Sequence, residues 1–169
     1  MTWLDLQQLE AYTRQTGLDV NSLMRKALQE AARAAELGEV PVGATVADAK
    51  GSMLAAAGNR SITRSDPSAH AEILALRRAG AQRGNYRLPG SLLITTLEPC
   101  IMCLGCLVQA RCAGLIFACP DPKAGAVVSR LQLEQDLGWL NHSFWHAQGL
   151  AQEESSALLR DFFRNKRHT

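Results

Sequence analysis

Segments with the apolar spacing of strands alternate with segments with the spacing of helices along this chain, and this alternation restricts its fold more than any other feature. Strands are predicted at 42–48, 53–58, 91–96 and 115–119, the first two joined by a turn. Helices are predicted at 22–37, 69–79, 99–109 and 152–166. The order predicts an α/β domain with helices on both faces of a sheet.

Composition is consistent with a packed domain and excludes several other classes. The chain has 169 residues, of which 47% are hydrophobic and 20% are charged, as in ordinary globular proteins. No apolar run approaches the ~20 residues of a membrane helix, and the first residues lack the pattern of a secretory signal. We therefore expect a cytoplasmic protein without a membrane partner. Residues 1–21 read as an N-terminal extension of unknown role, with an amphipathic pattern broken at Gly17.

Two of the five cysteines are spaced for one face of a helix. Cys100 and Cys103 follow Pro99, which suits the first turn of a helix, so both sulfurs would face the same side. A helix N-terminus also favours the thiolate form that metals bind. A single C-x-x-C pair is compatible with a redox pair or half of a zinc ribbon. Neither alternative is favoured, because no second C-x-x-C follows and the pair does not end a first βαβ unit.

His70, at another predicted helix start, adds a third metal ligand. Three protein ligands leave a fourth zinc position open, which is typical of catalytic sites, whereas four ligands close a structural site. Two thiolates cancel the charge of zinc, so water bound there is acidified less than at a three-histidine site. A neighbouring carboxylate must then take the proton. Glu72, two residues beyond His70, is the predicted proton carrier, with one zinc ion per chain.

A closed site is the alternative, and it depends on Cys106. If Cys106 were the fourth ligand, the chain would be a non-enzymatic zinc or RNA-binding module. On a continuing helix Cys106 lies about 120° round from Cys100. We therefore predict that it is a small, buried apolar residue, like Cys112 and Cys119.

The pattern H-x-E followed by P-C-x-x-C is the signature of zinc nucleobase deaminases. From about residue 24 to residue 167 the chain resembles the bacterial tRNA-specific adenosine deaminases of the cytidine-deaminase superfamily. Besides the two metal motifs, the resemblance is carried by Glu39-Val-Pro-Val-Gly-Ala44, Gly58-Asn59-Arg60, Asn85-Tyr86-Arg87-Leu88, Asp121-Pro-Lys-Ala-Gly-Ala126, Asn141-His142 and Asp161-Phe162-Phe163-Arg164.

The resemblance implies a three-layer α/β/α fold with a mixed five-stranded sheet, formed by a zinc-dependent deaminase domain at residues 22–169, and a homodimer. It implies hydrolytic deamination of adenosine to inosine at the wobble position of a tRNA anticodon. By the same resemblance, His70, Cys100 and Cys103 hold Zn²⁺, Glu72 transfers protons and Asn59 hydrogen-bonds the extruded base.

The choice between an RNA and a free base depends on the C-terminal residues. Aromatic side chains beside cations suit single-stranded RNA, and the candidates for contact with an anticodon stem-loop are Phe162, Phe163, Arg164, Lys166 and Arg167. No DNA partner is expected. If Phe162 instead belongs to the core and the cations only face solvent, the chain could be a deaminase of free guanine, cytosine or cytidine.

Overall fold

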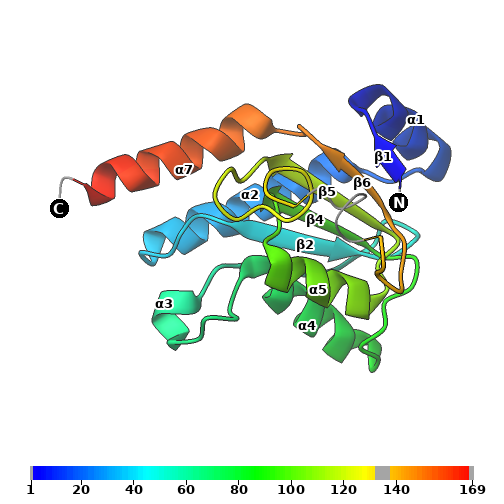
Figure 1. Cartoon of the computed structure of the whole chain (residues 1–169), viewed down its shortest axis with the longest axis horizontal. Coiled ribbons are helices and arrows are strands. Elements are labelled where there is room, and N and C mark those ends of the chain that lie inside the picture. Colours follow the sequence, from blue (N-terminus) through cyan, green and yellow to red (C-terminus); the bar gives the residue numbers. More distant parts are fainter. Residues whose placement is uncertain (1, 132–137, 168–169) are drawn as a thin grey trace.

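One mixed sheet forms the middle layer of the protein. A computed structural model describes residues 2–131 and 138–167, and within them six strands are arranged in the order β1-β6-β5-β4-β2-β3 (Figure 1). The strands are β1 (Thr2–Leu4), β2 (Gly43–Ala47), β3 (Met53–Gly58), β4 (Leu92–Leu97), β5 (Gly114–Cys119) and β6 (Trp145–Gln148). Strand β2 is antiparallel to β3 and β4, whereas β4, β5, β6 and β1 are mutually parallel. The three-layer α/β/α prediction is confirmed, with six strands in place of five.

Helices cover both faces of this sheet. The helices are α1 (Leu6–Thr16), α2 (Val20–Glu36), α3 (Ser61–Arg64), α4 (Ala71–Arg83), α5 (Ile101–Ala110) and α7 (Gln152–Lys166). Figure 1 shows α2 and α7 on one face and α4 and α5 on the other. Helix α7 has the predicted bounds, and α4 continues past the predicted end at 79 until Gly84 adopts a left-handed conformation. None of the helices in the described residues is long and apolar enough to cross a membrane.

Alternation along the central strands divides the core in two. Leu93, Leu115 and Phe117 pack toward α4 and α5, whereas Ile94 and Ile116 pack toward α2. All five side chains are buried, as period-two alternation requires when helices cover both faces.

Helix α2 lies unusually close to the sheet. Gly43 pairs with Gly58 across β2 and β3. A Cβ atom at Gly43 would lie 1.9 Å from the carbonyl oxygen of Ala27, and one at Gly58 would lie 2.4 Å from that of Glu30. Only glycine permits this approach, which fixes α2 against the strands that lead toward the candidate site.

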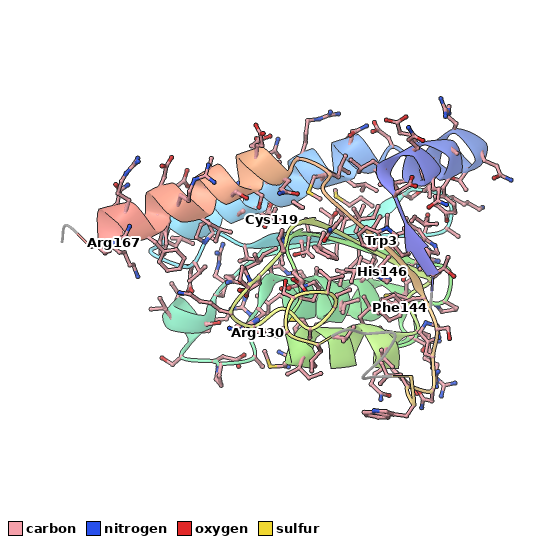
Figure 2. The ribbon with its side chains drawn as sticks, turned by 45° about the horizontal axis from the view of Figure 1, so that its top comes forward. Trp3, Cys119, Arg130, Phe144, His146 and Arg167 are labelled. Carbon is pink, nitrogen blue, oxygen red and sulfur yellow. The ribbon has the colours of Figure 1, made fainter. Side chains whose placement is uncertain are left out.

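The sixth strand comes from the N-terminal extension. Strand β1 pairs with β6, with Thr2 opposite Trp145, and the Trp3 ring meets His146 edge-on at 5.2 Å (Figure 2). The amphipathic pattern broken at Gly17 corresponds to α1, which Gly17 ends in a left-handed conformation. Strands β1 and β6 were not predicted, because three or four residues are too short to show a period.

Candidate active site

Two helix starts bring the predicted metal ligands together. His70 and Cys100 are the N-cap residues of α4 and α5, and Cys103 lies in the first turn of α5. The Cys100 and Cys103 sulfurs are 3.6 Å apart, and His70 Nδ1 lies 3.7 Å from Cys100 Sγ and 3.5 Å from Cys103 Sγ. A tetrahedral zinc ion with Zn–S of ~2.3 Å and Zn–N of ~2.0 Å separates such atoms by about 3.5–3.8 Å. The donor set therefore fits zinc in both chemistry and spacing.

Glu72 is buried beside these three side chains. It lies in the first turn of α4 and is 3% exposed. Its Oε2 atom has no hydrogen-bond partner among the residues that the structure describes. Burial raises the pKa of this carboxyl group to about 7. The group can therefore exchange a proton near neutral pH, and it has an oxygen atom available to do so.

The cysteine and histidine side chains influence one another electrostatically. The hydrogen bond with Cys103 lowers the pKa of Cys100 to about 3, and the same contact raises the pKa of Cys103. The contact with Cys100 raises the pKa of His70. A thiolate at the start of α5 is also favoured by the positive end of the helix dipole.

Asn59, the residue for which the family resemblance implies a hydrogen bond to the base, borders the same site. It follows β3 and is 8% exposed. Its Oδ1 accepts a hydrogen bond of 2.8 Å from the backbone N–H of Ala71, the residue after His70. The side-chain oxygen is thus committed to α4, which leaves the side-chain NH₂ group as the donor for a ligand.

Two buried glutamates that sequence reasoning had not singled out hold helix α3 and the segment 121–129 beside the site. Glu39, 1% exposed, accepts hydrogen bonds from the backbone N–H groups of Ile62 (3.2 Å) and Thr63 (2.8 Å) and from the Thr63 hydroxyl group (3.0 Å). Glu98, 2% exposed, accepts hydrogen bonds from the segment 121–129. Their position in the two motif segments, beside Val40-Pro41 and Pro99-Cys100, was the available signal.

The predicted RNA-contacting residues lie at the end of α7 and not at the metal group. Phe162 is half-buried, Phe163 is 48% exposed, and Arg167 marks the far end of the helix (Figure 2). Arg164 is ion-paired with Asp161 at 2.9 Å. Lys166 lies 5.0 Å from the Phe162 ring centroid and donates a hydrogen bond of 3.2 Å to the carbonyl oxygen of Gly38.

That last contact connects the end of α7 to one wall of the site. Gly38 precedes Glu39, and Glu39 holds α3, which follows Asn59 directly. Figure 1 shows α3 and the C-terminal end of α7 at the same end of the molecule. The basic end of α7 is therefore linked through Gly38 and Glu39 to α3, the helix that follows Asn59.

Cys106 stays outside the metal group. Among residues 2–131 and 138–167, the His, Cys and acidic side chains placed to hold a metal together are His70, Cys100 and Cys103. Cys106 packs half-buried against the core of α4 and α5, and Cys112 and Cys119 are buried. The arrangement favours a site with an open fourth position.

Comparison with known proteins agrees with this geometry. The protein-family model of the cytidine and deoxycytidylate deaminase zinc-binding region matches residues 19–119 of this chain. This segment contains the His/Cys/Cys group. The tRNA-specific adenosine deaminase of Haemophilus influenzae is 43% identical over 145 residues, which are 86% of this chain and 83% of that protein. The chain belongs to the tRNA-specific adenosine deaminase family.

Solved structures of deaminases are similar along most of the chain. The structure of a tRNA:A34 deaminase, studied for A-to-I editing at the wobble position, superposes with a TM-score of 0.77 and 40% identity. The match covers 82% of this chain and 99% of that chain. A guanine deaminase from Nitrosomonas europaea superposes with a TM-score of 0.73 and 25% identity, covering 86% and 85% of the two chains. The predicted resemblance is confirmed, and the zinc-binding region is shared.

Proposed function

We propose that this chain converts adenosine to inosine at the wobble position of a tRNA anticodon, releasing ammonia. The observation that carries the proposal is the buried Glu72 carboxyl group beside three ligand atoms at zinc spacing, with one oxygen atom that has no partner in the described part of the chain. Family membership supplies the substrate class, because the Haemophilus influenzae relative and the tRNA:A34 deaminase, at 43% and 40% identity, act on tRNA. The substrate implies action in the cytoplasm.

In this proposal His70, Cys100 and Cys103 hold one zinc ion per chain. Zinc, when bound at such a site, acidifies water at neutral pH. Glu72 accepts a proton and returns protons to the adenine ring nitrogen and to the leaving amine. The C6–N6 bond breaks and a C6–O bond forms, so water is consumed and ammonia is released. The Asn59 NH₂ group donates a hydrogen bond to the extruded base and holds it beside Glu72.

A stacked base cannot enter a recessed site, so the adenosine must leave its stack at a cost of a few kcal/mol. In an anticodon loop the bases are unpaired, which lowers this cost. The phosphates around the extruded nucleotide still have to be held. Arg164, Lys166 and Arg167 at the end of α7 are the proposed phosphate contacts, with Phe162 and Phe163 beside them for stacking.

The substrate class is tested by offering the purified protein anticodon stem-loops with adenosine at the wobble position, free adenine, guanine, cytosine, and cytidine. We expect ammonia and inosine from the stem-loop and no ammonia from the free compounds. Release of ammonia from guanine or cytosine, with an unchanged stem-loop, would replace this proposal by the free-base alternative.

The ligand set is tested separately by metal analysis. Cys100→Ala is expected to lose zinc and activity together, because two ligands hold zinc far less well than three. Cys106→Ala is the matched control, since it removes a thiol from the same helix outside the group. Full zinc in Cys100→Ala, or zinc loss in Cys106→Ala, would contradict the assignment.

We also propose that the chain is a homodimer, joined through the outer face of α4 and α5. This face carries the exposed apolar side chains of Ile101 (56%) and Met102 (36%), and a groove of about 480 Å³ lined by residues that include Tyr86 and Cys106. Light scattering during gel filtration should give twice the chain mass. An Ile101→Glu variant should run as a monomer, and a wild-type monomer at micromolar concentration would contradict the proposal.

A further inference from the structure

The carboxylate of Glu98 gathers the loop that follows β5. Glu98 comes directly after β4 and two residues before Cys100. Its Oε1 accepts hydrogen bonds from the backbone N–H groups of Val127 (2.9 Å), Val128 (2.7 Å) and Ser129 (3.0 Å). Its Oε2 accepts from the N–H of Asp121 (2.9 Å) and from the hydroxyl group of Ser129.

Backbone dipoles, and not a cation, stabilise this buried charge. No ion pair to Glu98 occurs within the described part of the chain, and its four N–H donors there come from the single segment 121–129. Hydrogen bonds to an ionised acceptor are stronger than those between neutral groups. A single side chain thereby fixes both ends of a loop that has no helix or strand of its own.

The loop in turn holds the backbone of Pro99 and Cys100. The N–H of Ala126 donates a hydrogen bond of 2.9 Å to the carbonyl oxygen of Pro99, and Gly125 forms an antiparallel bridge with Cys100. Gly125 packs directly against the Glu98 carboxylate, because a Cβ atom at Gly125 would lie 2.3 Å from the Glu98 carboxyl carbon. Carboxylate, loop and Cys100 backbone therefore form one closed set of contacts.

We infer that Glu98 is a positioning residue, which holds the 121–129 loop against Pro99-Cys100 and so keeps the Cys100 sulfur in place for zinc. Groups that orient metal ligands typically contribute 10- to 100-fold to metal affinity. The inference rests on the proposed role of Cys100 as a ligand. It adds a residue that does not touch the metal and whose action passes through the loop.

Zinc release distinguishes this role from a general effect on folding. In Glu98→Gln the NH₂ group replaces one acceptor and confronts N–H donors that it cannot pair with. We expect zinc to pass to an excess of chelator about 10-fold faster than from the wild type. Glu39→Gln is the matched control, because it alters a carboxylate that is equally buried and also accepts hydrogen bonds from backbone N–H groups. These N–H groups belong to α3 and not to the 121–129 loop. The control variant should lower the melting temperature and leave zinc release within twofold of the wild type.

A variant on the loop side tests the same link independently. Gly125→Ala forces the loop away from Glu98, so it should also accelerate zinc release about 10-fold. The double variant should release zinc no faster than the faster single variant, because both changes break one contact set. Ser129→Ala removes only the hydroxyl donor and should give a smaller change in the same direction.

The outcomes separate this inference from the proposed function. Wild-type zinc release in Glu98→Gln and Gly125→Ala, with zinc lost in Cys100→Ala, would overturn the positioning role alone. Faster release in Glu39→Gln to the same extent would also overturn it, since the effect would then follow stability. Full zinc in Cys100→Ala would overturn the ligand assignment and this inference with it.

Discussion

The cations at the end of α7 give a prediction whose size follows from the structure. Replacing Arg164, Lys166 and Arg167 together by alanine removes the proposed phosphate contacts, and none of the three belongs to the metal group. For single-stranded nucleic acid, each phosphate contact contributes ~0.7 to the slope of log affinity against log salt. The triple variant should therefore flatten the slope by up to about 2. Between about 50 and 200 mM salt, this amounts to an approximately 16-fold smaller loss of affinity.

The three side chains should not contribute equally. Arg164 is held by Asp161, so its contact with a phosphate competes with an existing ion pair. Asp161→Ala should release Arg164 and strengthen binding. Lys166 already donates to Gly38 O, and its loss should also loosen the end of α7. Arg167 is exposed and is expected to account for most of the salt dependence.

Fluorescence anisotropy with a labelled anticodon stem-loop across a salt series provides the measurement. The control variant replaces Arg14, Arg25 and Lys50, three exposed cations from other parts of the chain, and should leave the slope unchanged. Deamination by the α7 variant at saturating stem-loop should match the wild type. If the slope and the affinity of the α7 variant equal those of the wild type, the end of α7 is a solvated surface and the RNA-binding argument fails.

Three further perturbations test other parts of the structure. Glu72→Gln should retain zinc while single-turnover deamination falls by ~10²–10⁴-fold, and a rate within threefold of the wild type would remove Glu72 from the chemistry. Burial alone would raise the pKa of Glu39, but hydrogen bonds from Thr63 and Ile62 outweigh burial and hold the pKa below its usual value. The stability that this gives is present above pH ~4.3 and is lost as the pH falls through the lower pKa of the folded state. Glu39→Gln should therefore lower the free energy of unfolding at pH 7, and urea titrations should show a smaller decrease of that free energy in acid. Gly43→Ala should cost ~1–3 kcal/mol in thermal unfolding because its methyl group meets the Ala27 carbonyl. Gly105→Ala should not destabilise the chain, because its methyl group meets no atom of the described residues within 4 Å.

Features with a local signature could be predicted from the sequence, and those made by distant pairing could not. Helix α7 and the helices that begin beside His70 and Cys100 could be predicted from apolar periodicity and from Pro99, so the metal group could be proposed before any coordinates. Strand β6 has four residues and gains its conformation from β5 and β1, which no local pattern encodes.

The same distinction explains what was missed at the site. Most donors that meet Glu98 are backbone N–H groups, which every residue but proline carries. The residue types of the 121–129 loop therefore do not predict these hydrogen bonds. The cations at 164–167 were recognised by composition, but composition did not reveal that Lys166 is attached to the turn before Glu39. A charged side chain's partner depends on the fold, and the partner decides how freely the charge can meet RNA.

The pairing of β1 with β6 has a consequence for the order in which the chain folds. Thr2 and its partner Trp145 lie far apart along the chain, with β2 to β5 and their helices between them. Contacts between such distant residues are slow to form, because a long loop must close before they are gained. Strand β1 must therefore wait while β2 to β5 and their helices assemble. The Trp3 ring meets His146 only when that edge of the sheet is complete, so its fluorescence would report the last stage of folding.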